Sequence, residues 1–230
     1  VTYWAPIVVA GVAAIAAGWL PRRRPRWPWR AIGVCLAVVL AVCEGTWWVK
    51  LLGTRPFSAA TDLPLQLCDL TAWVAAAAML LRRETLYDLT WFWGVGGGIP
   101  ALFLPVRGAP FPNWFYFEFY LMHGALIVAG LLTVAAFQVR IRRGTLLRSL
   151  LITGAVTASL GIVDAATGGN YMYLSTLPSV TGPLQVLSNW PFYRIALCCV
   201  AAIVMVCLGW IARDRAHDAE TVTAPTGTSG

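Results

Sequence analysis

The chain has 230 residues, of which 59% are hydrophobic and 12% charged, and its mean hydropathy is +0.70. This composition excludes a soluble globular domain, in which about a quarter of the residues are charged. The formal net charge of +7 comes from basic residues in short loops between apolar runs. That pattern is typical of a polytopic membrane protein, so we predict an all-α transmembrane helical bundle.

Seven apolar runs approach the roughly 20 residues that a helix needs to cross the hydrocarbon core. The predicted spans are residues 2–20, 31–52, 63–81, 86–104, 114–138, 146–165 and 190–211. We expect the first run to be a retained helix rather than a signal peptide, because its basic residues follow it. The bundle is predicted to cover residues 1–212. Residues 213–230 have the composition of a disordered cytoplasmic tail.

The basic residues are distributed unequally between the two ends of the predicted bundle. Thirteen of the 17 lie in the loops after the first, third and fifth spans and in the C-terminal segment. Because cytoplasmic loops carry the excess of Lys and Arg, we predict a multi-pass plasma-membrane protein with its N-terminus outside and its C-terminus in the cytoplasm. The basic, Trp-containing loop Arg22–Arg30 is expected to contact anionic lipid headgroups and not nucleic acid.

Polar residues interrupt the second and third spans. Glu44 must face the bundle interior or water, because a carboxylate buried in lipid without a partner is costly. It could be a protonated residue that joins helices or part of a site. In the third span Gln66, Asp69 and Trp73 follow one another at helical spacings. They predict an inward face, with Cys68 on the adjoining arc.

The six cysteines show no metal-binding or redox spacing, and we predict neither a metal site nor a cofactor. Five of them lie in uniformly apolar runs, where cysteine behaves as a small hydrophobic residue. Cys68 has Gln66 and Asp69 as polar neighbours.

The segment Gly94–Pro100 is rich in glycine but lacks the Lys-Ser/Thr of a phosphate-binding loop. Gly94 and Gly98 predict close helix packing, and Pro100 predicts a broken helix. Asn113 is expected to cap the fifth helix.

On the fifth span Tyr116, Tyr120 and His123 form one helical stripe, with Glu118 on another face. His123 lies about 14 Å from the outer end of its helix, and Cys68 about 8 Å from the outer end of the third, at 1.5 Å per residue. These depths permit contact if the two helices are neighbours.

An imidazole beside Cys68 would take the thiol proton and leave a reactive thiolate. The simpler alternative is a core cysteine and a hydrogen-bonded helix histidine that do not act together. Residues available to support a catalytic pair are Glu44, Asp69 and Glu118, as acceptors that orient the imidazole, and Tyr120 and Gln66, as donors to an oxyanion.

Four segments resemble the YwaF-type, or transmembrane-protein-164-type, integral membrane family: Leu63–Cys68, Phe117–Gly124, Gly169–Leu174 and Trp190–Tyr193. The resemblance covers nearly the whole predicted bundle. Animal relatives in this family include a phospholipid acyltransferase that remodels ether lipids. The resemblance therefore implies catalytic roles for Cys68 and His123. The chain has Gln66 where many members have a histidine.

Acyl-coenzyme A is a charged cytosolic donor that would not reach an outward-facing site. The resemblance and the predicted topology together predict acyl transfer from a phospholipid to a lyso-lipid through a thioester. Asn170 and Tyr171 would contact headgroups or belong to an aromatic belt at the membrane interface. Two alternative functions are a non-enzymatic lipid or small-molecule transporter and an accessory subunit of a larger membrane complex. The chain could also form an oligomer or bind another membrane protein.

Overall fold

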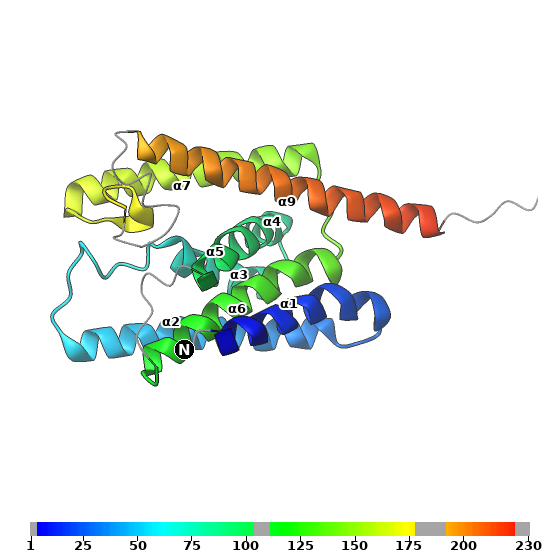
Figure 1. The fold of residues 1–230 in the computed structure, drawn as a ribbon, viewed down its shortest axis with the longest axis horizontal. Coiled ribbons are helices and arrows are strands. Elements are labelled where there is room, and N and C mark those ends of the chain that lie inside the picture. The colour runs from blue at the N-terminus through cyan, green and yellow to red at the C-terminus, as the bar shows by residue number, and fades with distance from the viewer. Residues whose placement is uncertain (1–3, 104–110, 178–191, 224–230) are drawn as a thin grey trace, which may run out of the picture.

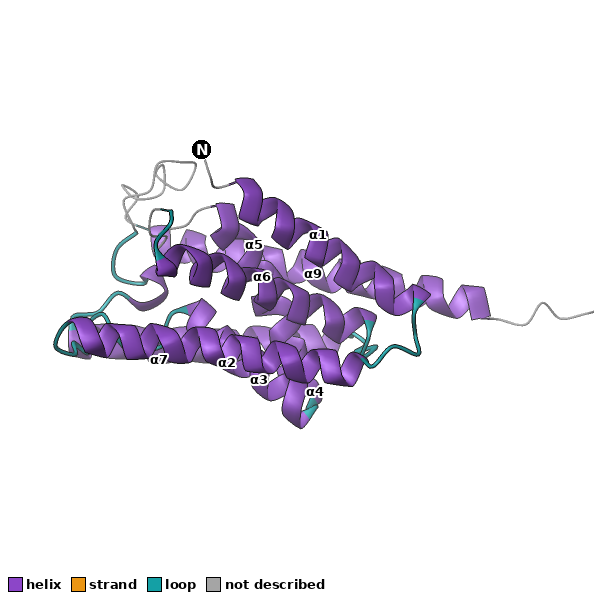
Figure 2. Cartoon of the chain, turned by 90° about the horizontal axis from the view of Figure 1, so that it is seen from below, coloured by secondary structure: helices purple, strands orange, loops and turns teal. Residues whose placement is uncertain are grey.

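The computed structural model describes residues 4–103, 111–177 and 192–223, with side chains up to residue 213 in the last range. All regular structure in these ranges is helical, which confirms the predicted fold class (Figures 1 and 2). The elements are α1 (Trp4–Arg23), α2 (Trp29–Thr54), α3 (Leu67–Leu81), α4 (Glu84–Leu89), the π-helix η1 (Thr90–Val95), α5 (Gly96–Phe103), α6 (Trp114–Ala135), α7 (Arg143–Thr167), the 3-10 turn η2 (Tyr171–Tyr173) and α9 (Tyr193–Thr223).

Every predicted span contains helix, and five helices are long and apolar enough to cross a membrane: α1, α2, α6, α7 and the Tyr193–Arg213 part of α9. The fourth span is three consecutive elements, α4, η1 and α5, with Pro100 inside α5. The backbone of α9 stays helical to Thr223, past residue 212, where the bundle was expected to end. The predicted disorder of residues 224–230 falls outside the ranges described above.

The third span is shorter than expected. α3 begins at Leu67, after Gln66 with an extended backbone, so Leu63–Gln66 is not helical. A residue before proline avoids the helical region, and Pro64 follows Leu63. The predicted inward face is wrong for Trp73, which is 47% exposed. The face of α3 that is buried instead carries mainly small residues, such as Ala72, Ala75 and Ala76.

The bundle has two parts (Figure 1). α7 and α9 lie against each other on one side, whereas α1, α2 and α6 lie on the other, with α3, α4 and α5 between them. α6 is central because it contacts α1, α2, α3, η1 and α5. The linker between α1 and α2, the linker between α6 and α7, and the C-terminal end of α9 lie at one end of the molecule (Figure 1). This arrangement agrees with alternating spans, while the direction across the membrane stays a prediction.

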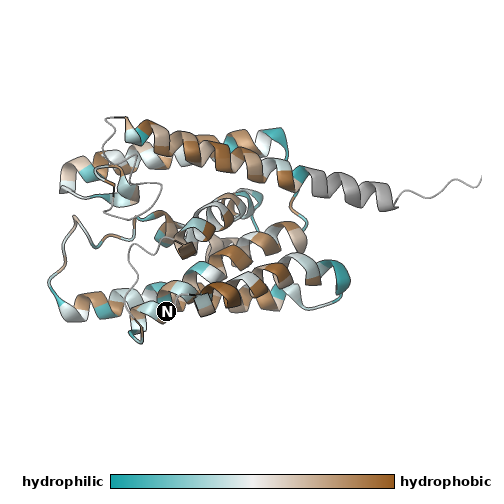
Figure 3. Ribbon diagram, in the orientation of Figure 1, coloured by the Kyte–Doolittle hydropathy of each residue, from teal (hydrophilic) through white to brown (hydrophobic). Residues whose placement is uncertain are grey.

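The long helices consist mainly of apolar residues (Figure 3), and many of their large apolar side chains are exposed. On α1, for example, Val9 and Ile15 are mostly exposed, and on α9 Ile203 and Trp210 are too. Large apolar side chains that cover whole helix faces indicate a lipid environment. The chain is therefore an integral membrane protein.

Two polar contacts join α7 to the helices between the two parts. Arg148 on α7 forms an ion pair with the buried Asp88 of α4. The indole N–H of Trp93 in η1 donates to Thr153 of α7 at 2.9 Å. Neither contact follows from the local sequence pattern, because the partners are 60 residues apart.

Glycines bring η1 and α5 close to α6. A methyl group at Gly94 would lie 2.6 Å from the carbonyl oxygen of Leu126, and one at Gly98 would lie 2.8 Å from the Ile127 side chain. On the facing helix, a methyl group at Gly130 would lie 3.0 Å from the carbonyl oxygen of Thr90. These contacts confirm that Gly94 and Gly98 serve close helix packing.

We expect Gly94→Ala to lower the free energy of unfolding by about 1–3 kcal/mol, because the added methyl group would push backbone against backbone. Gly11→Ala is the matched control, since a methyl group at Gly11 meets nothing within 4 Å. In the control, alanine should be neutral or stabilising by up to about 1 kcal/mol. Thermal unfolding in detergent measures both variants. A Gly94→Ala protein that melts at or above the wild-type temperature would contradict the close contact.

Candidate functional site

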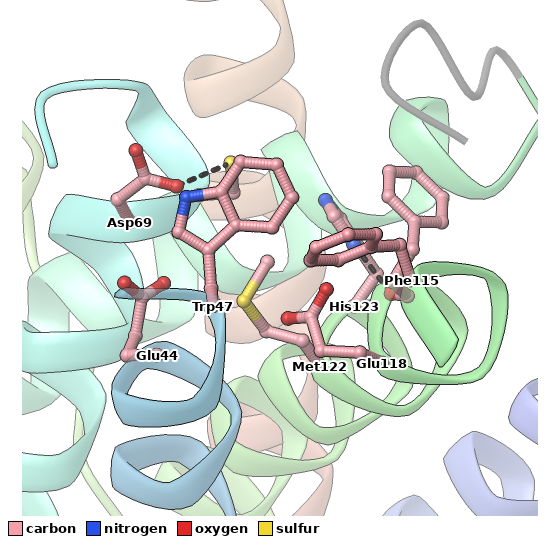
Figure 4. Close-up of a pocket in the computed structure, with 9 residues that line it drawn as sticks. Glu44, Trp47, Asp69, Phe115, Glu118, Met122 and His123 are labelled. Carbon is pink, nitrogen blue, oxygen red and sulfur yellow. Dashed lines mark hydrogen bonds between the residues drawn. The ribbon is translucent and has the colours of Figure 1, made fainter. Parts of the chain in front are cut away.

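A small, partly enclosed cavity lies where α2, α3 and α6 meet. The lining residues are Glu44 and Trp47 from α2, Cys68 and Asp69 from α3, and Phe115, Glu118, Phe119, Met122 and His123 from α6 (Figure 4). The structure thus brings five of the nine residues singled out in the sequence to one cavity: Glu44, Cys68, Asp69, Glu118 and His123.

Cys68 and Asp69 occupy the first turn of α3. One oxygen of Asp69 accepts a hydrogen bond from the Gln66 backbone N–H at 3.1 Å, and the other accepts one from the Cys68 thiol at 3.2 Å (Figure 4). The first of these bonds is half of a capping box, which satisfies an amide left free at a helix start. Asp69 therefore orients the thiol and also fixes where α3 begins.

The His123 imidazole is buried and has a defined tautomer. Its Nδ1 atom lies 2.7 Å from the carbonyl oxygen of Phe119, one turn earlier on α6. A carbonyl oxygen can only accept, so Nδ1 carries the hydrogen and Nε2 keeps a lone pair. The centre of the Phe119 ring lies 4.1 Å from that of the imidazole, with the two rings tilted by 34°, and this contact helps to hold the imidazole. An imidazole held this way can act as a base through Nε2.

The acceptor that orients His123 is thus a backbone carbonyl. The three carboxylates considered for that role lie elsewhere in the cavity wall: Glu44 and Asp69 on one side of Trp47, and Glu118 on the other (Figure 4). Glu118 lies on another face of α6 than the stripe that contains His123, and both residues nevertheless line the cavity. They can do so because α6 is buried around most of its circumference.

Gln66 and Tyr120 do not line the cavity, so the structure does not support their expected roles as oxyanion donors. The Gln66 side chain binds the segment that follows α7: its oxygen accepts from the Met172 N–H at 3.0 Å, and its nitrogen donates to the Asn170 carbonyl at 3.4 Å. Tyr120 is buried with Tyr116 and Phe119 on the side of α6 that faces α1 and α5. Both residues support the architecture around the site.

Tyr171 and Asn170 bind the segment that precedes α3 in the sequence. The Tyr171 hydroxyl accepts from the Leu63 N–H at 2.9 Å and donates to the Ala59 carbonyl at 2.7 Å, and the side chain is 1% exposed. The Asn170 side chain binds Ser175 and Thr176 within its own loop. The expected headgroup contact is therefore wrong for Tyr171, whose hydroxyl is used inside the protein.

Arg55 and Asp62 brace the other end of the same segment. Asp62 is paired with Arg55, and it also accepts from the Thr61 hydroxyl and the Ser58 N–H, each at 2.7 Å. Burial by itself raises the pKa of Asp62, but these hydrogen bonds and the Arg55 charge outweigh it and hold the pKa below its ordinary value. The chain from Arg55 to Gln66 is thus fixed at both ends.

Sequence reasoning missed the four apolar members of the cavity wall: Phe115, Phe119, Met122 and, as a lining residue, Trp47. Phe115 and Phe119 precede His123 by eight and four residues, and Met122 is the residue directly before it. The helical period could have identified Phe115 and Phe119 as neighbours of His123 on α6. In the ranges that the structure describes, no group of three His, Cys, Asp or Glu residues could hold a metal ion.

The fold and the cavity define an integral membrane protein in which a thiol, an imidazole and carboxylates line a polar pocket among apolar helices. A comparison with protein-family models matches the TMEM164 family over residues 1–209. The chain therefore belongs to the TMEM164 family, as the four motif segments predict. No curated protein and no solved structure matches the chain.

The Asp62 interactions predict a pH dependence of stability. Because the folded pKa lies below the ordinary value of about 3.9, the stabilisation is complete above that value and is lost as the pH falls through the folded pKa. We expect Asp62→Asn to melt at a lower temperature than the wild type near neutral pH, with a difference that shrinks as the pH falls below about 4. Melting curves across this range measure it; a difference independent of pH would contradict the ionised pair.

Proposed function

We propose that the protein transfers a fatty acyl group between membrane lipids through a thioester on Cys68, with His123 as the base and acid. The donor is a phospholipid and the acceptor a lyso-lipid, and the site faces the outer half of the plasma membrane. The observation that carries the proposal is the convergence of Cys68 and the basic tautomer of His123 on one cavity. Membership of the TMEM164 family supports it, given the lipid acyltransferase among the animal relatives.

In the first half of the reaction, His123 Nε2 takes the thiol proton and the Cys68 sulfur attacks the ester carbonyl of the donor. The carbon–oxygen bond of the ester breaks, and the imidazolium gives its proton to the departing alkoxide. The products are a lyso-phospholipid and an acyl thioester on Cys68. Because the leaving group keeps the proton, the imidazole is neutral again.

In the second half, the hydroxyl of the lyso-lipid gives its proton to His123 Nε2 and attacks the thioester carbonyl. The carbon–sulfur bond breaks, and the thiolate of Cys68 recovers the proton from the imidazolium. The position of Cys68 in the first turn of α3 favours this exchange, since the positive end of a helix dipole stabilises negative charge. Asp69 keeps the sulfur in place between turnovers.

The apolar surroundings of the cavity suit an acyl-transfer site. Phe115, Phe119 and Met122 give it apolar walls, against which the glycerol and the first methylenes of an acyl chain could pack. Limited access of water to the buried imidazole would protect the thioester from hydrolysis. These properties favour transfer to a second lipid over release of a free fatty acid.

The thioester is tested by incubating the purified protein with phospholipid that carries a labelled acyl chain. We expect a hydroxylamine-sensitive adduct on Cys68, found by mass spectrometry, and loss of both adduct and transfer in Cys68→Ala. Cys207→Ala is the matched control, because Cys207 is exposed on the apolar surface of α9 and should be dispensable. Full transfer activity in Cys68→Ala would overturn the thiol mechanism.

The role of His123 is tested separately. We expect His123→Gln to slow formation of the Cys68 adduct by about 10²–10⁴-fold, the usual contribution of a general base. Tyr120→Phe serves as the control on the same helix, since Tyr120 does not line the cavity, and its rate should stay close to wild type. Equal loss of activity in both variants, without a change in melting temperature, would contradict this assignment.

A further inference from the structure

Lys50 lies on the last turns of α2, beyond the residues that line the cavity. Its side chain is exposed. The ammonium nitrogen lies 5.6 Å from the centre of the Trp114 ring and 6.0 Å from that of Phe115, both at the start of α6. These distances are typical of cation–π interactions. The two rings therefore hold the charge over the junction of α2 and α6.

One aromatic ring separates this charge from the cavity. Phe115, which lies under Lys50, also lines the cavity and packs edge-on against Trp47 at 4.9 Å between ring centres. A ligand that enters past Phe115 and Trp47 would therefore pass the ammonium group before it reaches Cys68. Lys50 thus lies next to the Phe115 side of the cavity, and we call this side the mouth of the cavity.

The mouth carries a basic residue, whereas the cavity itself is lined by acidic ones. Glu44, Asp69 and Glu118 are among the lining residues, which include no lysine or arginine in the described part of the chain, so the cavity offers no cation to an anionic group. Lys50 forms no ion pair with any residue in the described part of the chain, whereas the nearby Arg55 is bound to Asp62. A free cation outside an acidic cavity favours a ligand whose anionic group stays at the mouth while a neutral group goes in.

A glycerophospholipid has this arrangement, because its phosphate and its neutral acyl esters are joined by glycerol. We propose that Lys50 binds the phosphate of the donor or acceptor lipid and so determines that the protein selects phospholipids over neutral glycerides. This inference rests on the proposed acyl transfer for its placement of the ester near Cys68. Lysine binds phosphate as a point charge through three donors.

The alternative is that Lys50 only extends toward the interface, as lysines near the ends of membrane helices commonly do. In that case its charge would not distinguish one lipid inside the cavity from another. A pair of lipids that share their acyl chains and differ only in the headgroup separates the two roles. Phosphatidylglycerol and diacylglycerol are suitable, because glycerol adds no second charge beside the phosphate.

The test measures binding of dioleoyl phosphatidylglycerol and dioleoylglycerol to the purified full chain by native mass spectrometry. We expect Lys50→Gln to weaken binding of the phospholipid about tenfold, as for the loss of one charged hydrogen bond, and to leave diacylglycerol binding unchanged. Lys50→Arg should keep most of the preference. Arg194→Gln, which removes a charge from the start of α9 and not from the cavity mouth, should bind both lipids as the wild type does.

Unchanged phospholipid binding in Lys50→Gln, or an equal effect of Arg194→Gln, would overturn the inference. Melting temperatures of the variants exclude unfolding as the cause of a change. The binding assay needs no turnover, and Cys68→Ala should bind phosphatidylglycerol normally. If the protein binds phospholipid selectively through Lys50 but transfers no acyl group, only the proposed function is refuted. If it transfers acyl groups through Cys68 but its phospholipid binding does not depend on Lys50, only the role of Lys50 is refuted.

Discussion

The close contact between the η1–α5 segment and α6 sets the arrangement on which the rest of the bundle depends. Inside a membrane, lipid is as apolar as the helices, so burial of apolar area provides little force between them and close packing provides more. Gly94, Gly98 and Gly130 allow the two backbones to approach. With one side of α6 fixed in this way, its other side faces α2 and α3, and the cavity lies between these three helices.

The polar groups of the cavity are compatible with a membrane bundle because most of their partners come from local backbone or neighbouring side chains. Asp69 binds the first turn of its own helix and the thiol of Cys68. His123 binds the carbonyl one turn earlier. Tyr171 then ties the chain before α3 to the segment after α7. Each bond offsets part of the cost of burying a polar group, and the bonds of Asp69 and His123 also fix the orientation of residues that the proposed chemistry uses.

Sequence reasoning predicted the helical class, the apolar spans, the cap at Asn113, and the packing role of Gly94 and Gly98. It also singled out Cys68 and His123, which line one cavity. These features follow from hydropathy, local chemistry and helical period. The inward face at Trp73 was wrong because α3 buries the neighbouring face, which carries Ala72, Ala75 and Ala76, and leaves Trp73 exposed. The contacts of Gln66 with Met172 and of Tyr171 with Leu63 span more than 100 residues, and local periodicity carries no information about such pairs.

The central claim is that His123 activates Cys68, and the rate of alkylation of Cys68 tests it without any choice of lipid. A short iodoacetamide is reacted with the wild type and with His123→Gln, and each cysteine is quantified by mass spectrometry, with Cys207 as the internal reference. The account predicts that Cys68 reacts at least about tenfold faster than Cys207 in the wild type, since the thiolate is the reactive form, and loses this advantage in His123→Gln. Equal rates at Cys68 in the two folded proteins would contradict it.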